Sequence, residues 1–249
     1  MKKNKIQFLR KTHRWLGLII GVQFLFWTVS GIYFSWTNLD EIHGDFEKKQ
    51  PSLLTADSTF VSPSLLIEQL QKIKPVEKII SFKLINILNA PVYQLIYEDH
   101  QSTKHQSVQL ADAKTGNFRP PLTEKEAIHL AAAHFNGTAN VKSTTYITSV
   151  DAYHEYRENP LPAYAVSFDN KNKTTIYVAT ELGTVEKFRN HPWRWFDWLW
   201  MTHTMDYATR DNFNNLLLRI FSVMGLLTVL SGFALFIFTF KTKKKKLIM

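Results

Sequence analysis

Two uninterrupted apolar runs dominate the hydropathy pattern of the chain. Residues 15–38 (WLGLIIGVQFLFWTVSGIYFSWTN) contain no charged side chain, and neither do residues 220–240 (IFSVMGLLTVLSGFALFIFTF). A helix needs roughly 20 apolar residues to cross the hydrocarbon core of a bilayer, so each run is long enough. Two buried helices of a soluble protein would instead need a core that surrounds both, and the remaining polar chain is too short to supply it. The pattern therefore predicts two transmembrane helices.

The position of the first run also raises the possibility of a cleaved signal peptide. Its apolar stretch is longer than the roughly 7–15 residues of a signal hydrophobic region, and no A-x-A cleavage site follows it. Aromatic side chains such as Trp15 and Trp36 stand at its ends, where the interfacial aromatic belt of a membrane protein lies. We therefore expect an uncleaved signal anchor.

Between the two runs, helical and strand-like patterns occur twice in the same order. Residues 62–75 and 123–136 show apolar positions at helical spacing, and Thr123 and Glu126 stand as in a capping box. A helix followed by an antiparallel meander, twice, predicts an α+β region with helices on one face of each sheet. The expected strands are residues 78–88, 92–97 and 107–113 in the first unit and 143–150, 163–168 and 175–179 in the second.

The two units end alike. The segment DAKTGNF contains Gly116 and the segment TELGTVEKF contains Gly183, at an offset of 67 residues (183 minus 116). Each glycine stands where a tight turn requires a positive φ. We expect the chain to leave each sheet after this turn.

The positive charge lies at the two ends of the chain. The 249 residues hold 30 Lys and Arg against 21 Asp and Glu, a net charge of +9. Six of the basic residues fall within residues 1–14 and five within residues 241–249, which leaves 19 basic against 21 acidic residues elsewhere. A nucleic-acid-binding protein would carry a basic face on its folded body, so this class is excluded. The positive-inside rule places both tails in the cytoplasm and the central region outside it.

These patterns together predict an α+β membrane protein in which two transmembrane helices flank an extracytoplasmic domain of two similar units. The expected segments are a cytoplasmic basic tail (1–14), a transmembrane helix (15–37), a first unit (38–120), a second unit (121–190), an aromatic interfacial segment (191–214), a second transmembrane helix (215–240) and a second cytoplasmic basic tail (241–249).

Several kinds of chemistry are missing from the sequence. The chain has no cysteine, which excludes disulfides, thiolate zinc sites, a cysteine nucleophile and cysteine-ligated iron–sulfur clusters. It has no G-x-S-x-G, H-E-x-x-H, P-loop or Rossmann glycine pattern. Neither apolar run contains an acid, which argues against a proton-driven transporter.

Three stretches of the chain resemble a known family. Helix-and-strand units ending in DAKTG resemble the PepSY domain. The opening THRWLGLIIGVQFLFWTVSGIYFSW and the later HTMDYATRDNFNNLLLRIFSVMGLLTVLSGFALF resemble helices of PepSY-associated transmembrane proteins, so the resemblance covers nearly the whole chain. Larger members, with four or more membrane helices, are linked to iron–siderophore uptake, and some are inner-membrane reductases that carry haem b on histidines. The resemblance implies an inner-membrane protein with a periplasmic central domain that serves as a component of a ferrisiderophore reductase.

Histidines are the candidate haem ligands. His13 precedes the first apolar run, His43 follows it, and His203 precedes the second and lies in the stretch that resembles the family. Helical rise separates His13 from His43 by roughly 30 Å, so these two cannot share one iron, whereas His43 and His203 lie on the same side and can converge. Two neutral imidazoles poise haem iron for electron transfer. The C-terminal tail has no histidine, so a haem on His13 requires a second subunit or a partner protein.

Several histidines also suit purely structural roles. His13 fits a polar position beside phospholipid headgroups. We expect His191 to cap or buttress a turn. The remaining histidines are expected at the surface: His100, His105, His129, His134 and His154.

Three further features remain. The first two allow more than one interpretation, and the third suits a structural role. The tryptophan-rich residues 191–207 form either an interfacial helix with its aromatic side chains in the lipid or an aromatic wall for a flat cofactor. Gly17 and Gly21 allow close helix approach, within the chain or between subunits, or leave room for a porphyrin. The polar residues after this aromatic segment are expected to form a hydrogen-bonded hinge: Asp206, Arg210, Asp211, Asn212 and Asn215.

Two functions remain open from the sequence. In the first, the protein is a haem b electron-transfer component that takes electrons from another membrane donor and docks a ferric siderophore on its outer domain. In the second, it is a non-enzymatic binding module whose open sheet edges regulate or tether a periplasmic protein such as a peptidase. The lipid bilayer is a partner in both, and a second copy of the chain is a candidate partner in the first.

Overall fold

The computed structural model describes residues 3–50, 52–54, 59–99 and 106–246. The chain divides into two compact units, which are described separately. Met1–Asn38 and Trp195–Met249 form one, here called the helical unit, and Leu39–Arg194 form the other, here called the sheet unit.

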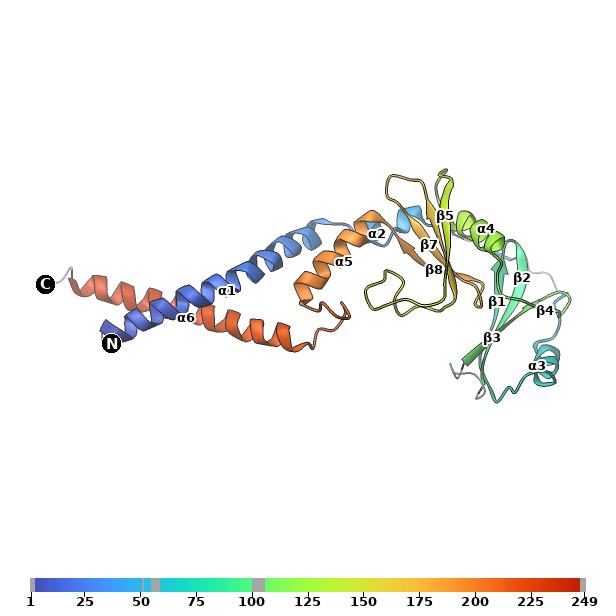
Figure 1. Cartoon of the computed structure of the whole chain (residues 1–249), viewed down its shortest axis with the longest axis horizontal. Helices are drawn as coiled ribbons and strands as arrows, with labels where there is room; N and C mark the ends of the chain where they lie inside the picture. Colours follow the sequence, from blue (N-terminus) through green and yellow to red (C-terminus); the bar gives the residue numbers. More distant parts are fainter. Residues whose placement is uncertain (1–2, 51, 55–58, 100–105, 247–249) are drawn as a thin grey trace. The chain divides into compact units, whose positions relative to one another are not determined.

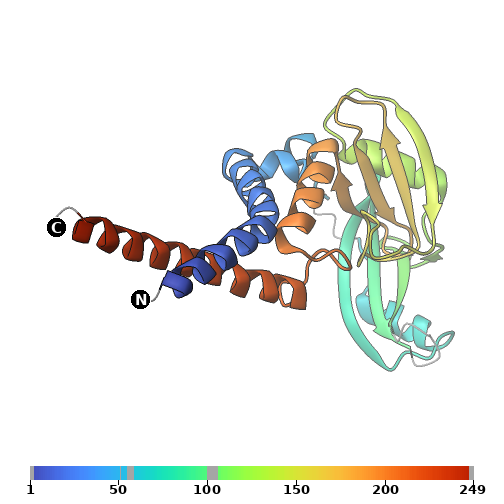
Figure 2. The same cartoon turned by 60° about the vertical axis from the view of Figure 1, so that its left-hand side comes forward.

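Two long helices make up most of the helical unit. They are α1 (Lys3–Trp36) and α6 (Leu216–Lys246), which lie against each other and cross (Figures 1 and 2). Both are long and apolar enough to cross a membrane, over Asn4–Trp36 and Leu216–Thr239. Many of their large apolar side chains are exposed, such as Phe233 and Phe236, as expected for helices whose neighbours are lipid chains. The prediction of two membrane helices is confirmed.

Both helices extend beyond the apolar runs. The sequence predicts basic tails outside the spans, but α1 already begins at Lys3 and α6 continues to Lys246. The lysine-rich and arginine-rich tails contain neither Gly nor Pro, and Lys and Arg are good helix formers, so nothing in them ends the helix.

The sheet unit contains the predicted duplication. The helix α3 (Pro63–Gln71) precedes one antiparallel sheet in the order β1-β2-β3-β4, and α4 (Glu124–His134) precedes a second in the order β5-β6-β7-β8 (Figure 1). Two short elements come first, α2 (Leu39–Ile42) and a 3-10 turn (Asp45–Glu47). The strands are β1 (Lys78–Ile87), β2 (Ala90–Glu98), β3 (Gln106–Asp112), β4 (Phe118–Arg119), β5 (Val141–Ile147), β6 (Ala163–Phe168), β7 (Thr175–Ala179) and β8 (Thr184–Arg189).

The turn glycines behave as predicted, but the chain after them does not. Gly116 and Gly183 have φ values of 77° and 71°. The expectation that the chain leaves each sheet at this point is wrong, because it turns back and pairs as β4 and β8. Gly183 is also tightly enclosed, since a Cβ built there would lie 2.6 Å from Cδ1 of Ile87. The two repeats therefore meet closely, and residues of both share one hydrophobic core.

The predicted capping box begins α4. The Thr123 hydroxyl accepts from the Glu126 backbone N–H at 3.4 Å, and the Glu126 carboxylate accepts from the Thr123 N–H at 2.8 Å. We expect Thr123→Ala to lower the free energy of opening of α4 by about 1 kcal/mol, the usual cost of losing such a cap. Hydrogen exchange of α4 amides in the full chain measures this. Lys125→Ala, an exposed change in the same helix, should alter it by less than about 0.5 kcal/mol, and an equal effect of both variants would contradict the prediction.

A half-buried ion pair ties the β5–β6 loop to the rest of the sheet unit. Arg194 makes two bonds to the Glu155 carboxylate, Nε to Oε2 at 2.6 Å and Nη2 to Oε1 at 2.8 Å. The Tyr177 hydroxyl donates to the same carboxylate at 2.8 Å. Burial alone would raise the pKa of the Glu155 carboxyl, but the hydrogen bonds and charge of Arg194 outweigh it and the pKa lies below its ordinary value.

Candidate functional site

His203 is held on α1 through its Nδ1 atom. It lies in the last turn of α5 (His191–Thr204), and its Nδ1 is 2.6 Å from Oγ of Ser30. The Ser30 hydroxyl has one hydrogen, which it donates to the Phe26 carbonyl at 2.6 Å, with the Trp27 carbonyl also within reach at 3.2 Å. With this hydrogen on a carbonyl, the Ser30 oxygen is left to accept from His203, and we assign the proton to Nδ1 and the lone pair to Nε2.

The backbone around His203 is fixed by the same face of α1. Helix C-termini leave carbonyl groups without intrahelical partners, and α5 ends here. Gln23 Nε2 donates to the Thr202 carbonyl at 2.9 Å, and Trp27 Nε1 donates to the His203 carbonyl at 2.7 Å. The ring of Phe34 lies edge-on to the imidazole at 5.6 Å. Burial lowers the pKa of His203, which favours the neutral imidazole.

His13 has the same arrangement on α6. Its Nδ1 is 2.7 Å from Oγ of Ser231, and the Ser231 hydroxyl donates its hydrogen to the Thr228 carbonyl at 2.7 Å. By the same reasoning Nδ1 of His13 is protonated and Nε2 is not. A Cβ at Gly232 would lie 3.3 Å from Cε1 of His13, so the glycine gives the ring room against α6.

The two histidines occupy different levels of α1. His13 and Ser30 are 17 positions apart (30 minus 13), which corresponds to about 25 Å along the helix axis. Each imidazole is bound by a serine that precedes a glycine, Ser30 before Gly31 and Ser231 before Gly232. The helical unit therefore presents two imidazoles with the same tautomer at two depths.

His43 lies in the sheet unit. It follows α2, its side chain is exposed, and its backbone N–H donates to the Leu39 carbonyl at 2.8 Å. Within the described residues no group of three or more His, Asp or Glu side chains is placed to hold a metal ion. His43 and the two serine-bound histidines thus belong to different units of the chain.

The other histidines differ in part from expectation. His129 is exposed as expected, whereas His134 and His154 are half-buried and hydrogen-bonded, because each ring finds a backbone partner on its own segment. His191 begins α5 and its N–H donates to the Asn172 carbonyl at 2.7 Å, while the cap of this helix is Asn190. His100 and His105 lie outside the described residues.

The aromatic side chains of α5 divide between two faces. Phe196 and Trp200 contact the ring of Phe34 on α1, at 4.9 and 5.8 Å between centroids. Trp195 and Trp198 are exposed. One face thus forms an aromatic wall on α1, and Trp195 and Trp198 lie on the other.

The loop between α5 and α6 is organised by Asp206, a predicted member of the polar hinge. Its carboxylate accepts from three backbone N–H groups, of Ala208, Thr209 and Asn212, and from the Thr209 hydroxyl. Arg210 pairs with Asp197 of α5, and Asn215 caps α6 through the Leu218 N–H. Burial would raise the pKa of Asp206, but these hydrogen bonds outweigh it and lower the pKa to about 2.

This loop should open in acid. The folded-state pKa of Asp206 lies below its ordinary value of 3.8, so its stabilisation is complete above about pH 4 and is lost as the pH falls toward 2. Hydrogen exchange of residues 205–215, corrected for intrinsic rates, should show protection falling through this range. Asp206→Asn should flatten the pH dependence. An unchanged pH dependence in this variant would refute the role of Asp206.

The small residues of α1 are not used in packing on α6. A Cβ built at Gly17 or Gly21 meets no described atom within 4 Å, and the same holds at Gly225 of α6. Among the described residues, these glycines therefore do not serve to bring α1 and α6 close together.

The fold and the apolar helices define a membrane protein whose α+β region stands between two membrane helices in the sequence. The family model described as PepSY-associated TM region matches residues 1–238, and the chain belongs to this family. A search of the curated proteins found no match, and a search of the solved structures found none.

Sequence reasoning missed the partners of the two histidines. In the sequence, Ser30, Ser231 and Gln23 are single polar residues within the apolar runs, and nothing local points to their partners. A signal was present, because a polar side chain inside a membrane helix is costly and usually has a specific partner.

Proposed function

We propose that this PepSY protein is a haem b electron-transfer component of iron–siderophore uptake in the cytoplasmic membrane. The observation that carries the proposal is the pair of serine-bound histidines. At both His13 and His203 the Nδ1 proton is donated to a serine whose own hydrogen is already used, which leaves Nε2 able to bind a metal.

The residues fit a haem in two respects. Iron-ligating histidines usually donate the other ring N–H to an outer partner, which fixes the tautomer and the ring orientation. Gly232 leaves the His13 ring uncrowded, and the nearby face with Gly17 and Gly21 is open. His203 would hold one haem and His13 another, each with a histidine of a second copy or of a partner protein as a further ligand, and His43 of the sheet unit is a third proposed ligand. Bound haem with two imidazole ligands supplies one-electron transfer.

The residues of the chain then have separate tasks. Ser30 and Ser231 keep the proton at Nδ1, and Gln23 and Trp27 hold the end of α5. The overall reaction takes one electron from a membrane donor, which is oxidised, and reduces ferric iron in a siderophore to ferrous iron. Ferrous iron is bound less tightly by the hard oxygen ligands of the siderophore, so it is released.

The orientation in the membrane belongs to the same proposal. Both termini lie in the cytoplasm and the sheet unit lies in the periplasm, since the basic residues are concentrated at the two ends. Protease added to intact spheroplasts should cleave the sheet unit and spare the tails. Protection of the sheet unit from the protease would contradict this orientation.

An absorption spectrum of the protein purified in detergent from haem-replete cells tests the proposed function. A Soret band, with sharp α and β bands on reduction, is expected. A colourless preparation would refute the haem proposal and favour the alternative, a non-enzymatic module that binds a periplasmic protein through an open sheet edge such as β8.

A further inference from the structure

The sheet unit contains a hollow with an unusual share of positive charge. Its volume is about 470 Å³, within the range of small-ligand pockets. It lies between β8, the end of α4 and the extended segment that follows the 3-10 turn. The residues that line it are His43, Lys48, Lys49, Gln50, His134, Val185, Glu186, Lys187, Phe188 and Arg189.

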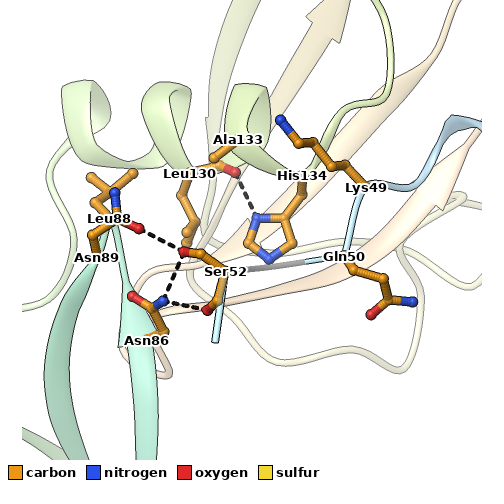
Figure 3. A pocket seen from close by; sticks show the side chains of 9 residues that line it. All are labelled: Lys49, Gln50, Ser52, Asn86, Leu88, Asn89, Leu130, Ala133 and His134. Atoms are coloured by element: carbon orange, nitrogen blue, oxygen red, sulfur yellow. Dashed lines mark hydrogen bonds between the residues drawn. The ribbon is translucent and has the colours of Figure 1, made fainter. Parts of the chain in front are cut away.

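A second hollow adjoins the first. It has a volume of about 410 Å³ and shares Lys49, Gln50 and His134 with its neighbour. Figure 3 shows the imidazole of His134 projecting into it between Ser52 and Gln50. The two hollows together are here called the Lys49 groove.

The charges along the Lys49 groove do not cancel. Lys48 is paired with Asp45 at 2.5 Å, but within the described residues Lys49 and Lys187 have no ion-pair partner. Arg189 donates to the backbone carbonyls of Glu155 and Phe188. The acid in the lining, Glu186, accepts from the Thr184 hydroxyl at 2.5 Å. The groove therefore keeps excess positive charge on a chain whose central region is slightly acidic.

Neutral polar groups complete the lining. Nδ1 of His134 donates to the Leu130 carbonyl at 2.8 Å, so Nε2 remains available. Ser52 donates to Asn89 and accepts from Nδ2 of Asn86, as Figure 3 shows. Oδ1 of Asn86 is buried and has no hydrogen-bond partner within the described residues.

We propose that the Lys49 groove binds a hydroxylated polycarboxylate, either free or wrapped around ferric iron. Carboxylates would lie beside Lys49 and Lys187, and a hydroxyl would donate to Nε2 of His134. This inference deepens the proposed function. It rests on that function for one point, namely that the bound ferric complex is then reduced. Binding itself requires no haem.

Equilibrium dialysis of the full chain in detergent tests the proposal with three probes: citrate, ferric citrate and an uncharged ferric trihydroxamate. We expect citrate or ferric citrate to bind, more weakly at high salt, and the trihydroxamate not to bind. Binding of ferric citrate alone would identify the chelate as the ligand. Equal binding of the trihydroxamate, or no binding of either citrate form, would overturn the proposal.

Variants locate the binding. The double variant Lys49→Glu and Lys187→Glu should weaken binding by about tenfold or more, because it places like charges beside the carboxylates. Lys142→Glu, on β5 at the opposite edge of the same sheet, is the matched control and should leave binding unchanged. Equal weakening by both would overturn the assignment. Measuring His203→Ala as well separates the two proposals, since groove binding should persist when haem is absent.

Discussion

Replacing His203 with alanine should remove about half or more of the haem absorbance of the purified protein, because His203 would be one of the residues that hold the haem. His13→Ala should remove the rest. The double variant of His13 and His203 should be colourless. The reduced-minus-oxidised spectrum per chain measures each loss. An unchanged spectrum in the double variant would exclude both histidines as ligands.

The serines should act through the histidines. Ser30→Ala and Ser231→Ala remove the acceptor of the Nδ1 proton, and we expect each to lower haem affinity by about 10–100-fold, the usual cost of losing such an outer partner. Ser35→Ala and Ser222→Ala are matched controls, since those hydroxyls donate to a carbonyl of their own helix. Ser30→Thr keeps the hydroxyl, so it should retain the haem affinity that Ser30→Ala loses. Equal effects of the test and control variants would show that the histidines are not held in this way.

The second large effect is expected in the sheet unit. Glu155→Ala leaves Arg194 without its carboxylate and removes the acceptor of the Tyr177 hydroxyl. Breaking one side of a fully buried ion pair costs about 3–5 kcal/mol. The side chains of Glu155 and Arg194 retain 19% and 33% exposure, so we expect a smaller loss of about 2 kcal/mol. Hydrogen exchange of β7 amides in the full chain measures this loss.

The matched control is an exposed ion pair of the same unit. Asp45 and Lys48 are 43% and 40% exposed, and such pairs contribute at most about 1 kcal/mol. Asp45→Ala should therefore have less than about half of the effect of Glu155→Ala. Comparable effects would mean that burial does not determine the contribution of these pairs.

The features that the sequence predicts well are those set by local pattern. An apolar run of sufficient length can only satisfy its backbone in a membrane as a helix, so both spans were predictable. The Thr123 cap and the glycine turns were predictable because each depends on a few neighbouring residues. The strands β4 and β8 were missed, because they are short and become strands through the neighbour with which they pair.

The candidate site was predictable only in part. His13 and His203 were singled out from their places beside the spans, but their tautomers depend on Ser231 and Ser30, which are 218 and 173 positions away in the sequence. Such pairings follow from which helix faces meet, and a single sequence does not specify this. The positive Lys49 groove was missed for the same reason, since its lysines come from two distant segments.

The electron paramagnetic resonance spectrum of the oxidised protein tests the assignment of His13 and His203 as haem ligands most directly. Two imidazoles on each iron predict a low-spin ferric signal that changes in the His13 and His203 variants. A high-spin signal, or no haem signal from protein made in haem-replete cells, would contradict it.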